Sequence, residues 1–432
     1  MNLVLTKILT FVPGITAVFA AYALGSQPAV AVDLSGTSAC LGAPALAAPS
    51  GNVIHVSNEA ALQKAMSNLT DGTTVVLANG TYNLSRSLVI RKNNVTIRGA
   101  TDSCDAVHLV GRGMENADYG NVPHGFFADV AGLTIANLAV SDVYFHPIKF
   151  NGRASSPHIY NVKLVDAGEQ FIKASPRKFA QGVDNGIVEY TIMEYTQGPP
   201  KTDHGGGTGY TNGVDVHAGH DWIIRNNLFK NFHTPDSADN LWAPAILMWN
   251  GATGTISENN VFINVDRAVA YGLKDRSTGT DHEGGVIRNN MVYYSPNINS
   301  TVRKNGSDAT IIVWDSPNTK VLHNTILTNG NLHHSIEFRF NTSNAVASNN
   351  LADKSINTRN GASYSGANNV FNAAPHMFAD PSIGDLHLVS SAKNAIDQAD
   401  LLSDSATDID GDNRPATHVD AGADEFIAPG NP

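Results

Sequence analysis

Charge is scarce in this sequence, and basic charge is scarcer than acidic charge. Only 16% of the 432 residues are charged, and 28 lysines and arginines stand against 39 aspartates and glutamates, a formal net charge of −11. This balance argues against a nucleic acid partner, because phosphate binding needs a basic stripe. It does not exclude an acidic polysaccharide, since a local basic groove can lie on an acidic protein.

Cysteine is almost absent, with Cys40 and Cys104 the only two in the chain. In an oxidising compartment they could pair and tie the N-terminal segment to the body of the protein. The alternative is two unpaired thiols. The small number of cysteines excludes a disulfide scaffold as the main source of stability.

The longest apolar run stands at the N-terminus. Lys7 precedes an almost wholly apolar stretch over 8–24, and Ala29-Val30-Ala31 fits a small-x-small cleavage site. Residues 1–31 are therefore predicted to be a signal peptide. A membrane anchor is the alternative, which Pro13 disfavours because it interrupts a short span. The mature protein is expected to be a periplasmic or extracellular monomer without membrane contact.

Most of the chain lacks the spacing of apolar residues that is typical of helices. The pattern that does recur is a pair of adjacent asparagines. The pairs are Asn226-Asn227, Asn259-Asn260, Asn289-Asn290, Asn349-Asn350 and Asn368-Asn369, with His323-Asn324 filling the gap in the series. From the second member of each pair the steps are 33, 30, 34, 26 and 19 residues. Self-similarity of this size is typical of stacked units in a solenoid.

Short β-type runs fill these units, as in "GTISENNVFINV" over 254–265. The pattern predicts an all-β protein, a right-handed parallel β-helix over 58–380. Asparagines at one turn of successive coils would stack into a ladder whose amides meet the open backbone of the turn. A β-propeller is the alternative, but its blades need about 40 residues or more.

The two ends of the solenoid have their own signals. An amphipathic helix over 58–69 follows a lead segment over 32–57 and is expected to cover the open N-terminal end. Residues 381–432 are expected to form a C-terminal cap. In that cap Asp408, Asp410 and Asp412 alternate as in a calcium loop, with a turn-rich cap without metal as the alternative.

The apolar N-terminal cap, the coil-length repeat and the asparagine ladder resemble the pectate-lyase-like superfamily of right-handed β-helices. That superfamily includes polysaccharide lyases, C5-epimerases and some glycoside hydrolases, and the resemblance covers most of the mature chain. It is architectural: the Asp-Pro-His-Asp motif of alginate epimerases and the Asp-Asp plus Arg-x-Lys pattern of pectin hydrolases are absent. The resemblance implies a carbohydrate-active protein, but a shared fold does not assign its chemistry.

A further strand in each unit can be aligned on one apolar residue. These residues are Ile148, Ile172, Val214, Ile246, Val269, Ile312, Ile336 and Ile356. Because strand side chains alternate between faces, the residues one and three positions later point outward. They include Lys149, Asn151, Lys173, Ser175, Asp215, His217, Leu247, Trp249, Glu337, Arg339, Asn357 and Arg359. Around Trp314 the register stays open, with Val313 and Asp315 or Ile312 and Trp314 outward. The alignment predicts a continuous charged and aromatic row on one outer face.

Three insertions enter just before this same strand, over 196–213, 233–243 and 295–309. Loops placed at one edge of a solenoid usually wall a functional groove. In this groove Trp242, Trp249 and Trp314 are expected to stack on sugar rings. The predicted substrate-binding residues are Lys149, Asn151, His220, Trp249, Trp314, Glu337 and Arg359.

The row fits β-elimination on a uronate, which needs a cation or metal at the carboxylate, a base and an acid. Lys173 or His217 is the predicted base, and Lys149 and Arg339 are predicted to neutralise the carboxylate. Asp215 and Glu337 are predicted to tune these cations or to bind Ca²⁺. The function predicted from the sequence is therefore a secreted polysaccharide lyase.

Other activities on the same fold stay open at this stage. A glycoside hydrolase would need two carboxyl groups flanking the bond, with Asp215 and Asp221 or Asp215 and Asp203 as candidates. A C5-epimerase would share the first proton abstraction with a lyase. A non-catalytic glycan-binding or adhesin β-helix would carry the charged row only as a solvated face.

Overall fold

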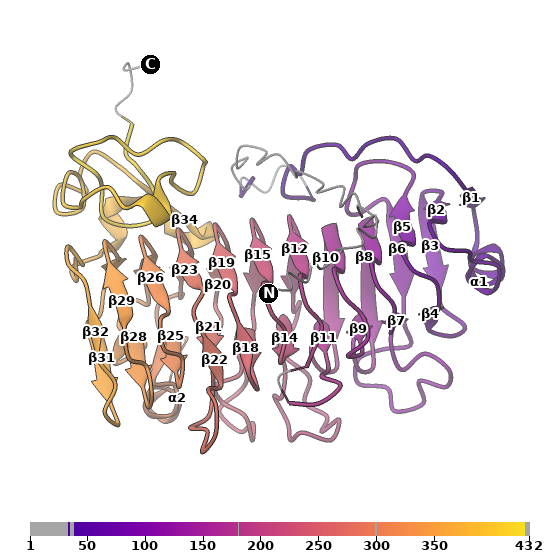
Figure 1. Cartoon of the computed structure of the whole chain (residues 1–432), viewed down its shortest axis with the longest axis horizontal. Coiled ribbons are helices and arrows are strands. Elements are labelled where there is room, and N and C mark those ends of the chain that lie inside the picture. The colour runs from indigo at the N-terminus through magenta and orange to yellow at the C-terminus, as the bar shows by residue number, and fades with distance from the viewer. Residues whose placement is uncertain (1–32, 35–38, 180, 299, 428–432) are drawn as a thin grey trace, which may run out of the picture.

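The computed structural model describes residues 33–34, 39–179, 181–298 and 300–427. These residues form an all-β right-handed parallel β-helix, the hand that parallel crossovers almost always take (Figure 1). Within these ranges, no helix is long and apolar enough to cross a membrane. The predicted signal peptide, 1–31, lies outside the described residues.

Three strand faces run the length of the solenoid. The first consists of β1 (Val53–Val56), β2 (Thr74–Leu77), β5 (Thr96–Gly99), β8 (Thr134–Val143), β10 (His158–Ala167), β12 (Ile187–Glu189), β15 (Ile223–Arg225), β19 (Ile256–Glu258), β23 (Val286–Arg288), β26 (Lys320–Leu322), β29 (Ala345–Ser348) and β32 (Tyr364–Ser365). The second consists of β3 (Gly80–Asn83), β6 (Val107–Val110), β13 (Ile192–Glu194), β16 (Leu228–Lys230), β20 (Val261–Ile263), β24 (Met291–Tyr293), β27 (Thr325–Leu327) and β30 (Leu351–Ala352), and the long strands β8 and β10 bend across both faces.

The third face carries the candidate site. It consists of β4 (Leu88–Ile90), β7 (Phe126–Ala128), β9 (Ile148–Phe150), β11 (Ile172–Ala174), β14 (Val214–His217), β17 (Pro244–Trp249), β21 (Arg267–Tyr271), β25 (Ala309–Trp314), β28 (His334–Arg339) and β31 (Ile356–Arg359). The remaining elements are α1 (Glu59–Ser67), α2 (Thr301–Gly306), β18 (Ala252–Thr253), β22 (His282–Glu283), β33 (Phe378–Asp380), β34 (Asp385–Leu388), η1 (Pro375–Met377), η2 (Pro381–Ile383) and η3 (Ser403–Ser405).

The two members of each asparagine pair have different structural roles. The first member has a positive φ, 54° at Asn259 and 50° at Asn289, a conformation that asparagine tolerates better than most residues. The second member is buried and stacks on its counterpart in the next coil: Asn260 Nδ2 donates to Asn290 Oδ1 at 3.0 Å. His323, with φ 50°, takes the place of the first asparagine in its coil. The predicted ladder is confirmed.

The ladder allows a stability prediction. Asn290 accepts bonds from the amide N–H and Nδ2 of Asn260 and donates to Ser257 O and Asn324 Oδ1, at 2.9–3.0 Å. Asn290→Ala leaves these buried partners unsatisfied, so we expect the free energy of unfolding to fall by about 3 kcal/mol. Urea unfolding measures this loss. Asn305→Ala, at an exposed position of α2, is the control and should change little; an equal loss in both would contradict the ladder's role.

The N-terminal helix lies at the end of the solenoid, where it contacts β1 and β4 (Figure 1). Asn58 caps it by accepting a hydrogen bond from the Ala61 N–H at 2.9 Å. Leu62 and Ala65 point from the helix into the main apolar core. The helix therefore adds apolar cover to the first coil.

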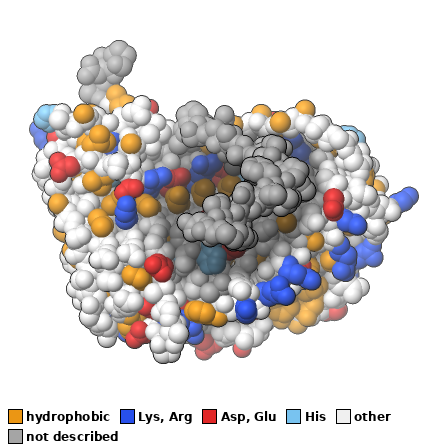
Figure 2. Space-filling model, viewed as in Figure 1, with side chains coloured by type: hydrophobic (Ala, Val, Ile, Leu, Met, Phe, Trp, Pro, Cys, Tyr) orange, Lys and Arg blue, Asp and Glu red, His pale blue; other side chains and the backbone are white. Residues whose placement is uncertain are grey.

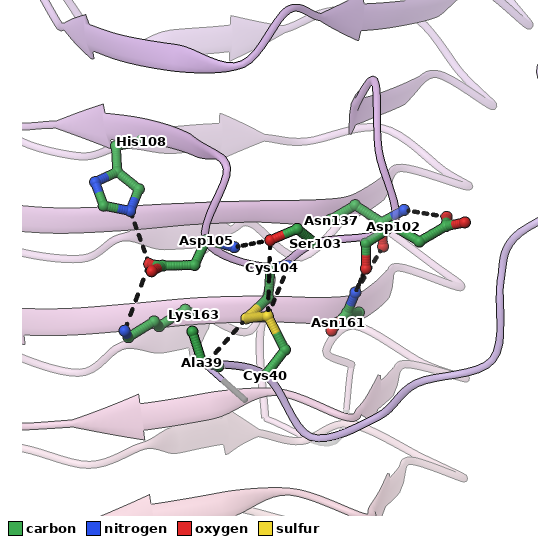
Figure 3. The surroundings of a disulfide bond; sticks show 10 residues. All are labelled: Ala39, Cys40, Asp102, Ser103, Cys104, Asp105, His108, Asn137, Asn161 and Lys163. Carbon is green, nitrogen blue, oxygen red and sulfur yellow. Dashed lines mark hydrogen bonds and ion pairs between the residues drawn. A yellow bond between two sulfur atoms is a disulfide. The ribbon is translucent and has the colours of Figure 1, made fainter. Parts of the chain in front are cut away.

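Cys40 and Cys104 form a disulfide with 5.7 Å between their Cα atoms, the first of the two states that the sequence left open (Figure 3). The loop that carries Cys104 is held to the coils by Asn137 and Asn161, whose Nδ2 atoms donate to Asp102 at 2.9 Å. The bond therefore fastens the N-terminal lead segment to a rigid part of the solenoid.

Loss of this disulfide should destabilise the protein measurably. The bond joins residues 64 positions apart, and closing a loop of this length restricts the unfolded chain by about 4 kcal/mol in the chain-entropy account. Adding reductant should therefore lower the urea midpoint of the native protein. A Cys40→Ser/Cys104→Ser double variant should start from the lower midpoint and not respond to reductant. An unchanged midpoint in the reduced native protein would refute the prediction.

The C-terminal segment packs along the side of the solenoid. Phe378, Leu386 and Leu388 form a second apolar cluster with outward side chains of β20, β24, β27 and β30, and Figure 1 shows the segment beside these coils. These contacts lie on the second face, along the side of the coils. Apolar side chains on the outside of these strands, such as Val261, explain the packing.

The alternating aspartates Asp408, Asp410 and Asp412 lie in a turn of this segment. Asp408 Oδ1 accepts hydrogen bonds from the N–H groups of Asp410 and Asp412 at 3.0 and 2.9 Å. The carboxylate therefore closes its own turn instead of facing an ion with the other two.

Candidate functional site

The strand alignment made from sequence is correct on the third face, with one shift. Ile148, Ile172, Val214 and Ile246 are register partners on adjacent strands. On β25 the partner of Val269 is Ile311, not Ile312. Ile312 and Trp314 are therefore the outward pair, the second of the two registers left open.

The predicted continuous polar row is interrupted in its middle. Leu247, Ala270 and Ile312 occupy the outward position on β17, β21 and β25 and form an apolar cluster with Trp314. The outer face is thereby divided into two groups of charged side chains. We call Lys149, Lys173, Asp215 and His217 the lysine cluster. The arginine cluster, on the far side of the apolar patch, consists of Arg267, Trp314, Glu337, Arg339 and Arg359.

The lysine cluster is built around a buried carboxylate. Asp215 has no exposed surface, and Lys173 donates to its Oδ2. The indole N–H of Trp249 donates to Oδ1 at 2.9 Å. Burial alone would raise the pKa of Asp215, but the Lys173 ammonium outweighs burial and holds that pKa well below its usual range. Asp215 is therefore ionised, and its two oxygens accept hydrogen bonds from Lys173 and Trp249.

His217 is held between protein groups on both sides of its ring. Its Nε2 lies 2.9 Å from Lys173 Nζ, and its Nδ1 lies 2.5 Å from Asn250 Nδ2. Arg276 donates to Asn250 Oδ1, which fixes the amide with its nitrogen toward the ring. Because both ring nitrogens are in contact with protein groups, His217 is poorly placed to take a proton from a substrate.

The two lysines on adjacent strands differ in their electrostatics. Lys149 and Lys173 are register partners on β9 and β11. Burial lowers the pKa of Lys149 to about 8, and the positive charge of Lys173 adds to that effect. Burial also acts to lower the pKa of Lys173, but the Asp215 carboxylate outweighs it and raises that pKa above its ordinary value. Lys173 is thus a fixed cation, and Lys149 loses its proton at mildly alkaline pH.

Two further groups complete the cluster, and the sequence analysis missed both. Glu169, just before β11, lies with its Oε2 3.4 Å from His146 Nε2, and burial raises its pKa to about 7 despite the nearby lysines. Tyr210, from the loop over 196–213, has its hydroxyl hydrogen-bonded to Lys173, and burial raises its pKa. Neither belongs to a strand, so alternation did not reveal them; their positions just before an aligned strand were the available signal.

The three insertions stand before β14, β17 and β25, where the sequence placed them, at the lower edge in Figure 1. They contact one another: the Thr208 N–H donates to Asp239 Oδ2 at 2.9 Å, and Arg303 Nη1 donates to Leu241 O at 2.8 Å. Together they form a connected wall along one edge of the third face. Tyr210 reaches the lysine cluster from this wall.

The arginine cluster has a carboxylate of its own. Glu337 Oε1 accepts the Trp314 indole N–H at 3.0 Å, and its Oε2 lies 3.1 Å from Arg359 Nε. The guanidinium carbons of Arg267 and Arg339 lie 5.1 and 4.7 Å from the centre of the Trp314 ring. Trp314 is therefore a buried support for the arginines and not an open platform for a sugar.

A cavity of about 270 Å³ adjoins the arginine cluster. Its lining residues are Trp242, Arg267, Leu273, Gly306, Asp308 and Trp314. Trp242 is 39% exposed and is the tryptophan with the most open surface at this end of the face. Of the tryptophans that the sequence offered for sugar stacking, Trp242 is open to solvent and Trp314 is buried.

Several predicted site residues lie apart from the lysine cluster. Glu337 and Arg339 on β28 are four strands from Asp215 on β14, about 19 Å at the usual strand spacing. Asp215 and Glu337 therefore cannot bind one Ca²⁺ ion together, and Arg339 cannot act on the sugar that meets Lys173. The sequence alignment did not separate these two groups, because it gives the face of a side chain and not its distance along the stack.

The other predicted residues occupy the margins of the site. His220 lies in the turn after β14, where its Nδ1 is 3.1 Å from Asp184 Oδ1, and it does not join Asp215. Asn151 lines a separate cavity of about 310 Å³ with Arg153 and Arg177. Arg359 belongs to the arginine cluster. Among the proposed hydrolase partners, Asp203 is exposed in its loop and accepts the Gly205 and Gly207 N–H groups.

The opposite side of the solenoid provides a contrast. On the first face Glu189, Arg225, Glu258 and Arg288 are register partners on successive strands. Arg225 pairs with Glu189 at 2.7 Å, and Arg288 pairs with Glu258 at 2.5 Å. Figure 2 shows such alternating acidic and basic side chains in a row. These charges neutralise one another, so the row is an ion-pair ladder.

The fold and the site together define a parallel β-helix with a buried lysine pair on an outer face. No protein-family model and no curated protein matches the chain. Among solved structures it is similar to the pectate lyase Pel9A, with 11% identity, 88% of this chain and 97% of the other covered, and a TM-score of 0.47. It is also similar to an alginate lyase from Paenibacillus sp. strain FPU-7, with 14% identity, coverage of 74% and 95%, and a TM-score of 0.42.

The surface adhesin PfbA of Streptococcus pneumoniae is similar as well, with 12% identity, coverage of 71% and 88%, and a TM-score of 0.40. These likenesses concern the course of the chain alone. The chemistry of this protein depends on the side chains of its own site.

Proposed function

We propose that the protein is a polysaccharide lyase that cleaves a uronate-containing polymer by β-elimination. The observation that carries the proposal is the lysine pair, in which one lysine is a fixed cation and its neighbour has a pKa of about 8. Elimination beside a carboxylate needs these two properties side by side: a positive charge that stabilises the developing enolate and a base that removes the adjacent proton.

The geometry supports one assignment of roles. Lys173 neutralises the uronate carboxylate, because Asp215 keeps it protonated. Lys149, on the adjacent strand, takes the proton from the carbon next to that carboxylate. Tyr210 donates a proton to the leaving glycosidic oxygen, and the resulting phenolate would lie beside the Lys173 ammonium that already binds its hydroxyl. This assignment exchanges the roles that sequence analysis gave to the two lysines.

The arginine cluster and the cavity beside Trp242 extend the proposed binding face along the stack. An acidic polymer that crosses Lys149 and Lys173 would present a later carboxylate to the arginines at the other end. The disulfide supports an oxidising site of action, in agreement with the predicted export to the periplasm or the cell exterior. No step of the proposed elimination is assigned to a metal ion.

The experiment is incubation of the purified protein with alginate, polygalacturonate, glucuronan, hyaluronan and chondroitin, each with and without Ca²⁺. A lyase produces an unsaturated uronate, which absorbs in the ultraviolet, and the productive polymer identifies the substrate. New reducing ends without that absorbance would indicate a hydrolase instead. Binding without any cleavage would indicate an adhesin, and a changed uronate epimer without cleavage would indicate an epimerase.

A further inference from the structure

A group of metal-ligating side chains lies in the C-terminal segment, on a different face from the proposed catalytic cluster. His387 in β34, Asp410 and Asp424 come from three separate stretches of that segment. One ligand atom from each lies within 4.8 Å of the other two, the only such group of three found in the described part of the chain. Nothing in the proposed elimination uses these residues.

The histidine is arranged as in many metal sites. Its Nδ1 lies 2.6 Å from Asp385 Oδ1, which leaves Nε2 as the atom that faces Asp410, 3.2 Å from Oδ2. A histidine that binds a metal through one nitrogen usually donates the other ring N–H to a carboxylate, which fixes the ring orientation. Asp385 is in position to be that carboxylate.

The third proposed ligand, Asp424, is a buried carboxylate. Asp424 is 5% exposed, and its Oδ2 accepts the Leu388 N–H at 2.6 Å. Its ligand atom lies within 4.8 Å of those of His387 and Asp410. The carboxylates of Asp410 and Asp424 carry like charges at this short separation, and a cation bound between them would offset their repulsion.

We propose that His387, Asp410 and Asp424 bind a divalent metal ion of the zinc type, with Asp385 orienting the histidine. One imidazole nitrogen and two carboxylate oxygens suit Zn²⁺ or a similar transition metal better than Ca²⁺, which prefers an all-oxygen shell. The ion joins β34 to the turn over 408–412 and to the end of the segment over 420–425. Its role is to stabilise the segment that covers the second face.

The test is titration of the chelator-treated full chain with Zn²⁺ and, separately, with Ca²⁺, followed by calorimetry and thermal unfolding. We expect one Zn²⁺ per chain, a raised Tm and much weaker Ca²⁺ binding. His387→Asn and Asp424→Asn should abolish both the binding and the rise in Tm. Asp385→Asn should weaken binding by roughly 10–100-fold, the usual effect of a group that orients a ligand.

The matched control is His418→Asn, because His418 is an exposed histidine whose Nδ1 lies 3.9 Å from Asp397 and which is not part of the group. It should bind Zn²⁺ as the native chain does. No binding by the native chain, equal binding of Ca²⁺, or full binding by Asp424→Asn would each overturn the proposal. Because these readouts need no polysaccharide, they are independent of the lyase assay.

Discussion

Lys149→Ala is expected to slow uronate elimination by about 10²–10⁴-fold, the usual contribution of a positioned general base. The pKa of Lys149 is lowered to about 8, so a large fraction of the side chain is neutral at mildly alkaline pH. For the native protein we therefore expect activity to rise with pH and to level off above about pH 8. Initial rates across a pH series, for the native protein and the variant, measure both effects.

Lys149→Arg separates the two roles that a lysine could have at this position. An arginine keeps the positive charge but cannot give up its proton in a protein. If Lys149 is the base, this variant should be as inactive as Lys149→Ala; if it only neutralises a carboxylate, much activity should survive. Lys230→Ala, which removes a lysine paired with Glu194 on the second face, is the control and should retain native activity.

Asp215→Asn is expected to damage both stability and activity. The carboxylate is fully buried against Lys173, and removing one partner of a buried ion pair typically costs about 3–5 kcal/mol, because the remaining charge has no counterion. Loss of that anion should also lower the pKa of Lys173, so that it no longer acts as a fixed cation. Urea unfolding and the elimination rate at saturating polymer measure the two losses.

A double variant tests whether the stability loss comes from the uncompensated charge. Lys173→Met combined with Asp215→Asn removes both charges, so it should be more stable than Asp215→Asn alone and still inactive. Asp166→Asn is the matched control at a carboxylate that is bonded to Thr196 on the exposed surface. If Asp215→Asn proved as stable and as active as this control, the proposed function of the buried pair would be wrong.

The fold could be predicted from sequence because it repeats. Asn260 and Asn290 are separated by the length of one coil, and each occupies the same buried turn position. Because this asparagine recurs in many coils, its spacing alone predicts a solenoid. The strand alignment was correct from Ile148 to Val269 for the same reason. It failed by one residue at β25, where Ile311 and Ile312 are both apolar and alternation cannot distinguish them.

The site was predicted only in part, because its chemistry depends on depth and distance. Sequence placed Lys149, Lys173 and Asp215 on one outer face, and the structure brings them together. It could not show that Asp215 would raise the pKa of one lysine while burial lowered that of the other. Glu169 and Tyr210 lie outside the strands, in segments whose conformation has no period to read.

The role of the lysine cluster is tested most directly by a crystal structure of the Lys149→Ala variant with a bound oligosaccharide. The ligand is oligogalacturonate or oligoalginate, according to which polymer the native protein cleaves. We expect one uronate carboxylate at Lys173, with its neighbouring carbon facing the space left by the Lys149 side chain. The rest of the bound oligosaccharide should run along the third face toward Arg339 and Arg359. An oligosaccharide bound on another face, with the lysine cluster empty, would contradict the proposed catalytic role of that cluster.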